Sequence, residues 1–127
     1  MSNIILRSTK DWKLWYRYIK DEAREHMVLQ FVDLETTDRI SELKELQQSE
    51  PPKDITVQTK LIWEIANSQY RDQHMRHKQM ISGVGKVKKT IRRTVPFKTL
   101  ERLEDFDDIR DIMEALKERY LSNESRA

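Results

Sequence analysis

Apolar residues recur every three or four positions in the N-terminal part of the chain, which is the spacing of one helix face. Charged residues fill the positions between them, and Asp11 follows Ser8 at the spacing of a capping box. The pattern predicts a helix from about Lys10 to His26. Its aromatic cluster resembles a platform for nucleic-acid bases, but helical spacing favours a place in the core. The apolar series is Trp12, Trp15, Tyr16, Ile19 and Ala23.

A second pattern follows the two prolines of the segment SEPPKD, residues 49–54, which we expect to be a loop. A long helix is predicted after it, with Trp63 beside an apolar series of Leu61, Ile62, Ile65, Ala66 and Tyr70. Gly83 and Gly85 either break this helix or let another helix approach it closely. A further series, from Ile81 through Ile91 to Val95, ends at Pro96.

Shorter segments connect these helices. The run from Val28 to Leu34 is compatible with a short helix or an extended stretch, and Asp38 is placed to cap a short helix reaching Leu46. A short piece near Leu100 leads to a last helix, which we expect Asp105 or Asp107 to cap. The apolar series of that helix is Ile109, Ile112, Met113, Leu116 and Tyr120.

Composition supports a helical protein. The 127 residues include only two glycines and three prolines, too few for the turns of a sheet protein. We therefore expect an all-α fold, a compact bundle of about five to six helices forming one domain over residues 1–127. No apolar run is long enough to span a membrane, so we expect a cytoplasmic protein without a membrane partner. The expected core comprises Trp12, Trp15, Tyr16, Ile19, Trp63, Tyr70, Ile91, Ile112 and Leu116.

Charge is distributed in two blocks of opposite sign. Residues 71–93 carry eight Lys or Arg against one Asp, and residues 101–118 carry eight Asp or Glu against three basic residues. Such blocks close on each other, pair between copies, hold a polyanion, or simply form solvated faces. The candidate nucleic-acid-binding residues are Lys86, Lys88, Lys89, Arg92 and Arg93. The candidate self-association residues are Glu104, Asp105, Asp107, Asp108 and Asp111.

Catalytic chemistry has no support in the sequence. The chain has no cysteine, no glycine-rich phosphate loop and no nucleophile with a recognisable context. His74 and His77 have the spacing of two metal ligands, but a solvated pair fits their polar surroundings better. The acidic run lacks the glycine and the spaced oxygens of a calcium loop. We expect neither an enzyme nor a cofactor, metal or small-molecule substrate.

An ordered set of phrases covers nearly the whole chain. IILRSTKDWKLWYRYIKDEA opens it and LQFVDLE follows, and then come SEPPKD and a helix with Trp63 and Tyr70 seven residues apart. IRRTV and IMEALKERY complete the set. In this order the phrases resemble the N-terminal half of Gag from fungal copia-type LTR retrotransposons.

The resemblance implies a capsid-like N-terminal domain that self-associates into virus-like particles around RNA. It implies as partners other copies of the chain, bound weakly, and full-length Gag and RNA. The second capsid domain and the later parts of the polyprotein are missing, so we expect an excised domain or a short host-borne relative. Such a relative has a conceivable role as a restriction-type inhibitor of particle assembly. The alternative function is a sequence-independent RNA-binding module that uses the basic helix of residues 86–93.

Overall fold

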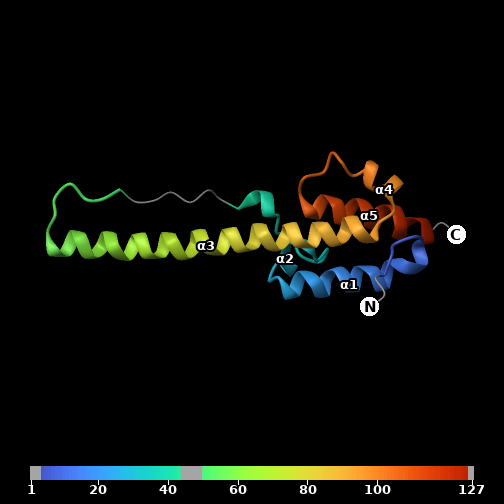
Figure 1. The fold of residues 1–127 in the computed structure, drawn as a ribbon, viewed down its shortest axis with the longest axis horizontal. Coiled ribbons are helices and arrows are strands. Elements are labelled where there is room, and N and C mark those ends of the chain that lie inside the picture. The colour runs from blue at the N-terminus through green and yellow to red at the C-terminus, as the bar shows by residue number, and fades with distance from the viewer. Residues whose placement is uncertain (1–3, 44–49, 126–127) are drawn as a thin grey trace. The chain divides into compact units, whose positions relative to one another are not determined.

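The computed structural model describes residues 4–43 and 50–125, and every regular element in these ranges is a helix. The all-α expectation is thus confirmed. The α-helices are α1 (Trp12–Glu25), α2 (Leu29–Val32), α3 (Val57–Thr94), α4 (Phe97–Glu101) and α5 (Ile109–Ser125), and two 3₁₀ turns are η1 (Thr9–Asp11) and η2 (Ile40–Glu42). Figure 1 shows them in order along the chain.

The chain divides into two compact units. The first comprises residues 1–42 and 80–127, and the second comprises residues 43–79. Helix α3 contributes its first 23 residues, Val57–Gln79, to the second unit and the rest to the first. The expectation of one domain over residues 1–127 stays a prediction.

The core of the first unit lies where α1, α5 and the C-terminal part of α3 run alongside one another (Figure 1). From α1 it takes the face predicted from the sequence, with Trp15 and Ile19 fully buried. Of the expected core, Tyr16 and Ile112 are only partly buried. The buried apolar residues of the three helices are Trp12, Trp15, Ile19, Ala23, Val84, Val87, Ile91, Ile109, Met113, Leu116 and Tyr120.

The N-terminal helix begins as expected but in two parts. The turn η1 precedes α1, and the backbone N–H of Ser8 donates to the carboxylate of Asp11 at 3.1 Å. The helix ends at Glu25, and Met27 takes a left-handed conformation with φ of 60°. The N–H of Val28 donates to the carbonyl of Ala23, and that of Met27 donates to Arg24. This is the Schellman pattern that terminates a helix, here with methionine at the position that glycine usually takes.

The two glycines do not break α3. A Cβ atom on Gly83 would lie 2.9 Å from the carbonyl oxygen of His26 and 3.0 Å from Val28 Cγ1, whereas one on Gly85 would meet nothing. Gly83 therefore permits a close approach between α3 and the corner that follows α1. Of the two possibilities left open by the sequence, close approach is the one observed, and it occurs at Gly83 alone.

The short connecting segments also take definite forms. The run after α1 is the short helix α2, and the expected helix after Asp38 is reduced to the turn η2. Leu46, which was expected to belong to that helix, and Ser49 of the predicted loop lie outside the described residues. Residues 50–56 have no regular structure, in agreement with the two prolines.

The second unit contains the start of α3. Thr56 and Thr59 cap it reciprocally, because the N–H of each residue donates to the hydroxyl of the other at 2.9 and 3.1 Å. Trp63 and Tyr70 were expected in the core, but both belong to this second unit and remain partly exposed. The ring of Tyr70 stacks on that of His74, with centroids 5.6 Å apart.

Candidate nucleic-acid and self-association surfaces

A groove between α1 and the C-terminal part of α3 gathers most of the predicted basic residues. Its volume is about 560 Å³. The four Lys and Arg side chains in it are exposed, and one carboxylate opposes them. Helical spacing brings the cations to neighbouring positions on α3, so they present closely spaced N–H donors to one anion. The lining residues are Glu22, His26, Lys86, Lys89, Arg92 and Arg93.

Thr90 lies beneath this groove and fixes two of its charged groups. Its side chain is 1% exposed, and its hydroxyl donates to Glu22 Oε1 at 2.7 Å. The same hydroxyl oxygen accepts a hydrogen bond of 3.1 Å from Arg93 Nη2. Glu22 and Arg93 are therefore held in place through Thr90, whereas Lys86 and Lys89 are exposed beside them.

Lys88 differs from the other four candidate cations. It is partly buried, and its ammonium group donates a hydrogen bond to the backbone carbonyl of Asp107. It lines a different groove, which lies between α3 and α4 and which it shares with Arg92. The predicted five-residue patch is thus divided, because Lys88 contacts the other side of the unit.

The acidic candidates are divided too. Asp108 is 6% exposed and caps α5, accepting 2.9 Å and 2.6 Å hydrogen bonds from the N–H of Arg110 and the hydroxyl of Ser41. Burial disfavours its ionised form, but the hydrogen bonds from Ser41 and from the backbone of Arg110 outweigh burial and lower the pKa of Asp108. The prediction that Asp105 or Asp107 caps α5 is wrong, because Asp108 directly precedes the helix and accepts the N–H of Arg110.

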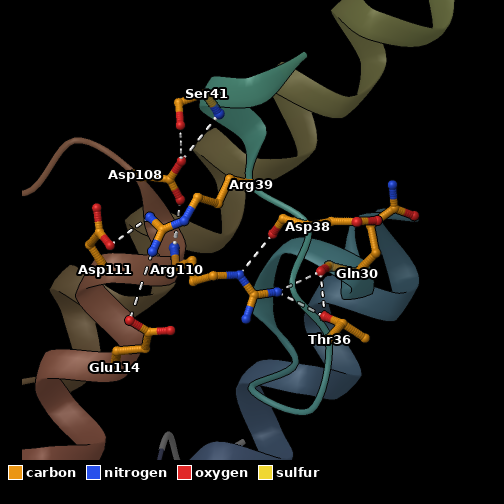
Figure 2. A network of polar contacts seen from close by, with 9 residues as sticks. All are labelled: Gln30, Thr36, Asp38, Arg39, Ser41, Asp108, Arg110, Asp111 and Glu114. Carbon is orange, nitrogen blue, oxygen red and sulfur yellow. Dashed lines mark hydrogen bonds and ion pairs between the residues drawn. The ribbon is translucent and has the colours of Figure 1, made fainter.

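Asp111 is also occupied within the chain. Its carboxylate accepts a 2.6 Å hydrogen bond from Arg39 Nη1, and Glu114 lies 3.9 Å from the same guanidinium (Figure 2). The hydrogen bond to Asp111 raises the pKa of Arg39 despite some opposing desolvation. Contacts across the chain thus engage Asp108 and Asp111, and their role in self-association stays a prediction. Glu104, Asp105 and Asp107 remain exposed.

Arg110 is a structural residue that the sequence patterns did not reveal. It is 3% exposed and extends from α5 into the segment after α2 (Figure 2). Its Nε donates to the carbonyl of Asp38 at 2.8 Å, and its Nη2 donates to the carbonyl of Gln30 at 2.9 Å and to Thr36 Oγ1 at 2.8 Å. Arg110 thereby joins the chain around residues 30–38 to α5.

Glu104 and Asp107 line a groove of about 380 Å³ between α3, α4 and the following loop. Phe97 and Phe106 stand in it with 73% and 40% of their surface exposed. Glu101 also lines it, with a third carboxylate. The two phenylalanines escaped the sequence analysis because neither lies on a helical stripe.

The start of α3 carries an exposed apolar stripe. Leu61, Ile62 and Ile65 are 55%, 61% and 53% exposed, and Val57 is 88% exposed. Trp63 and Tyr70 lie on the opposite side of the helix and are less exposed. We call Val57, Leu61, Ile62 and Ile65 the α3 stripe.

Among the described residues, no group of three or more His, Asp or Glu side chains is arranged to hold a metal ion. In the same part of the chain, no helix combines the length and the apolar character needed to cross a bilayer.

Comparisons of the chain with protein-family models, with curated proteins and with solved structures return no match.

Proposed function

We propose that this chain is a structural domain of the Gag type, which self-associates as capsid domains do in particles that enclose RNA. The observation that carries the proposal is the α3 stripe. Its four apolar side chains are each more than half exposed, while the apolar residues of α1 and α5 pack into a core. Contiguous exposed apolar surface of this kind marks protein–protein interaction sites.

Burial of the stripe supplies the driving force. Removing apolar surface from water contributes about 25 cal/mol per Å². The charges beside the stripe suit a pairing between copies, because Lys60 and Glu64 lie one helical turn apart. In an antiparallel pair centred near Ile62, Lys60 of one copy lies next to Glu64 of the other. The resemblance to Gag, which spans nearly the whole chain, supports a second copy as the partner.

Sedimentation velocity over a wide concentration range tests this proposal. The parent chain should grow in size with concentration, and Leu61→Gln with Ile65→Gln should shift association to at least tenfold higher concentration. The matched control is Met27→Gln with Ile81→Gln, which changes two apolar residues outside the stripe that are also more than half exposed. A parent that stays monomeric at millimolar concentration, or a stripe variant that associates like the parent, overturns the proposal.

A second candidate function, RNA binding, is favoured by the groove between α1 and α3. Four cations converge there against Glu22. They suit a phosphate backbone, since neutralising each phosphate releases bound counterions and makes the affinity salt-dependent. The groove is lined by no Trp, Tyr or Phe on which bases would stack strongly, so binding is expected to be independent of sequence.

Fluorescence anisotropy with an unstructured single-stranded RNA tests the second candidate. Lys86→Glu with Lys89→Glu should weaken binding at least tenfold and reduce its dependence on salt. Lys98→Glu with Lys117→Glu is the control of equal charge, because both lysines are exposed and neither lines the groove. Arg93 is left intact because it contacts Thr90. Equal binding by the two double variants would contradict a role for the groove.

A further inference from the structure

The groove beside α4 combines features of a docking site. Phe97, with 73% of its surface exposed, and Phe106 offer aromatic surface. Glu101, Glu104 and Asp107 line it with three carboxylates, and the exposed guanidinium of Arg92 lies among its α3 residues. Lys88 lies on the α3 side and is engaged with the carbonyl of Asp107. The groove therefore suits a partner that presents an apolar side chain among cations.

The outward face of α1 has the complementary composition. Leu14 is 60% exposed there, on the side of the helix opposite the buried Trp15 and Ile19. Its exposed neighbours Lys10, Lys13 and Arg17 are all basic. The nearest exposed acid, Asp21, forms a 2.9 Å ion pair with Arg24. An apolar side chain among cations is thus present on this chain itself.

We propose that the groove beside α4 in one copy binds the outward face of α1 in a second copy. Leu14 fills the space between Phe97 and Phe106, and Lys13 and Arg17 face Glu101 and Glu104. This inference rests on the proposed self-association and names a second contact for it. Apolar contact supplies affinity, and the opposed charges fix the orientation of the two copies.

The two surfaces differ, so the contact is head-to-tail. After two copies pair, the pair keeps one free groove on one copy and one free α1 face on the other, so further copies can add. The result is a ring or an open chain, depending on the rotation between neighbours. An α3 stripe pairing is two-fold instead, so it would join one such ring or chain to another.

A mixing experiment tests the contact by sedimentation velocity at low salt. All chains carry Leu61→Gln with Ile65→Gln, which removes the α3 stripe. One variant adds Leu14→Gln with Arg17→Gln, and the other adds Phe97→Gln with Glu104→Gln, so that the two altered surfaces do not attract each other. Each alone should remain monomeric, because one of the two surfaces is lost. An equimolar mixture has one intact groove and one intact α1 face and should form a dimer that grows no further.

The stripe-deficient background itself should grow beyond a dimer, and salt should weaken this growth by screening the charges. A background that stays monomeric, or a mixture that stays monomeric while the background associates, overturns the inference. The α3 stripe is tested separately, by comparing the intact chain with the stripe-deficient background. Failure of one proposal is therefore distinguishable from failure of the other. All four substituted side chains are exposed, so thermal unfolding should give unchanged Tm values.

If a variant does unfold, a charge exchange replaces it. Arg17→Glu and Glu104→Arg are each introduced singly and then together in one chain. Each single change should weaken association at least tenfold, and the combination should recover most of the loss. Absence of recovery would contradict the pairing of Arg17 with Glu104.

Discussion

The indole N–H of Trp15 donates a buried 2.8 Å hydrogen bond to the hydroxyl of Thr94, which lies 79 residues further along the chain. The Thr94 hydroxyl in turn donates to the carbonyl of Thr90 at 2.8 Å, and the carbonyl of Thr94 accepts the N–H of Leu6 at 2.7 Å. A single threonine at the end of α3 thus connects that helix to α1 and to the N-terminal segment. Burial makes each of these polar groups dependent on its partner.

We therefore expect Thr94→Val to destabilise the first unit by about 1–3 kcal/mol, because it leaves the indole N–H without an acceptor. Urea unfolding measures this loss. In a Trp15→Phe background the same substitution should cost about 1 kcal/mol less, since no indole donor remains to be left unpaired. Equal costs in the two backgrounds would show that the hydrogen bond contributes nothing.

The two glycines of α3 offer a matched pair of substitutions. Gly83→Ala should lower the free energy of unfolding by about 1–3 kcal/mol, because the added Cβ would lie 2.9 Å from the backbone carbonyl oxygen of His26. Gly85→Ala should raise it by about 0.5–1 kcal/mol, because the site is open and alanine favours a helix. Thermal unfolding of the two variants should give Tm shifts of opposite sign, and shifts of the same sign would contradict the packing at Gly83.

The lowered pKa of Asp108 predicts that the stability of the chain depends on pH. Its pKa in the folded chain lies below the usual value near 4, so the unfolded chain binds the proton more tightly. The contribution of Asp108 is complete above the unfolded pKa and decreases as the pH falls through the folded pKa. Asp108→Asn should destabilise the chain by about 2 kcal/mol at pH 7, because the amide keeps only one acceptor oxygen for the hydrogen bonds from Ser41 and Arg110.

Urea unfolding at pH 7 and pH 3 checks this expectation. The difference in the free energy of unfolding between the parent and Asp108→Asn should become smaller at pH 3, where Asp108 of the parent begins to be protonated. Glu118→Gln, an exposed residue of the same helix, is the control and should show little difference at either pH. A difference that is constant between the two pH values would refute the ionised cap.

Arg110 should be sensitive even to a conservative change. Lysine keeps the charge but cannot reach the carbonyls of Asp38 and Gln30 together in the planar arrangement that arginine allows. We expect Arg110→Lys to cost about 2–3 kcal/mol and to speed hydrogen exchange in residues 30–41 more than in α1. Exchange that rises uniformly over the first unit would argue against a local connection through Arg110.

Local periodicity was enough to predict the helices that pack on one face. Trp12, Trp15 and Ile19 in α1, and Met113 and Leu116 in α5, follow helical spacing and are buried as that spacing requires. The loop at the two prolines and the end of α3 before Pro96 follow equally from the backbone restrictions of proline. These features depend on residues close together in sequence.

The start of α3 shows where periodicity stops being informative. Apolar residues lie on both sides of this helix, with Leu61 and Ile65 on one and Trp63 and Tyr70 on the other. Spacing identifies each apolar side of the helix but does not tell which of the two is covered in the folded chain. Packing of the second unit leaves Leu61 and Ile65 exposed and partly covers Trp63 and Tyr70.

The sequence by itself determined the helical class, the main apolar faces and the two blocks of opposite charge, because these depend on composition and near-neighbour spacing. Only the tertiary structure decided which charged side chains are exposed and which are engaged by other parts of the chain. Lys88 meets the carbonyl of Asp107, and Asp108 meets Ser41 from a segment 67 residues away. It also separated Gly83 from Gly85, since two residues along a helix place them on different faces. Contacts between distant segments set the environment of each group, and no local pattern encodes them.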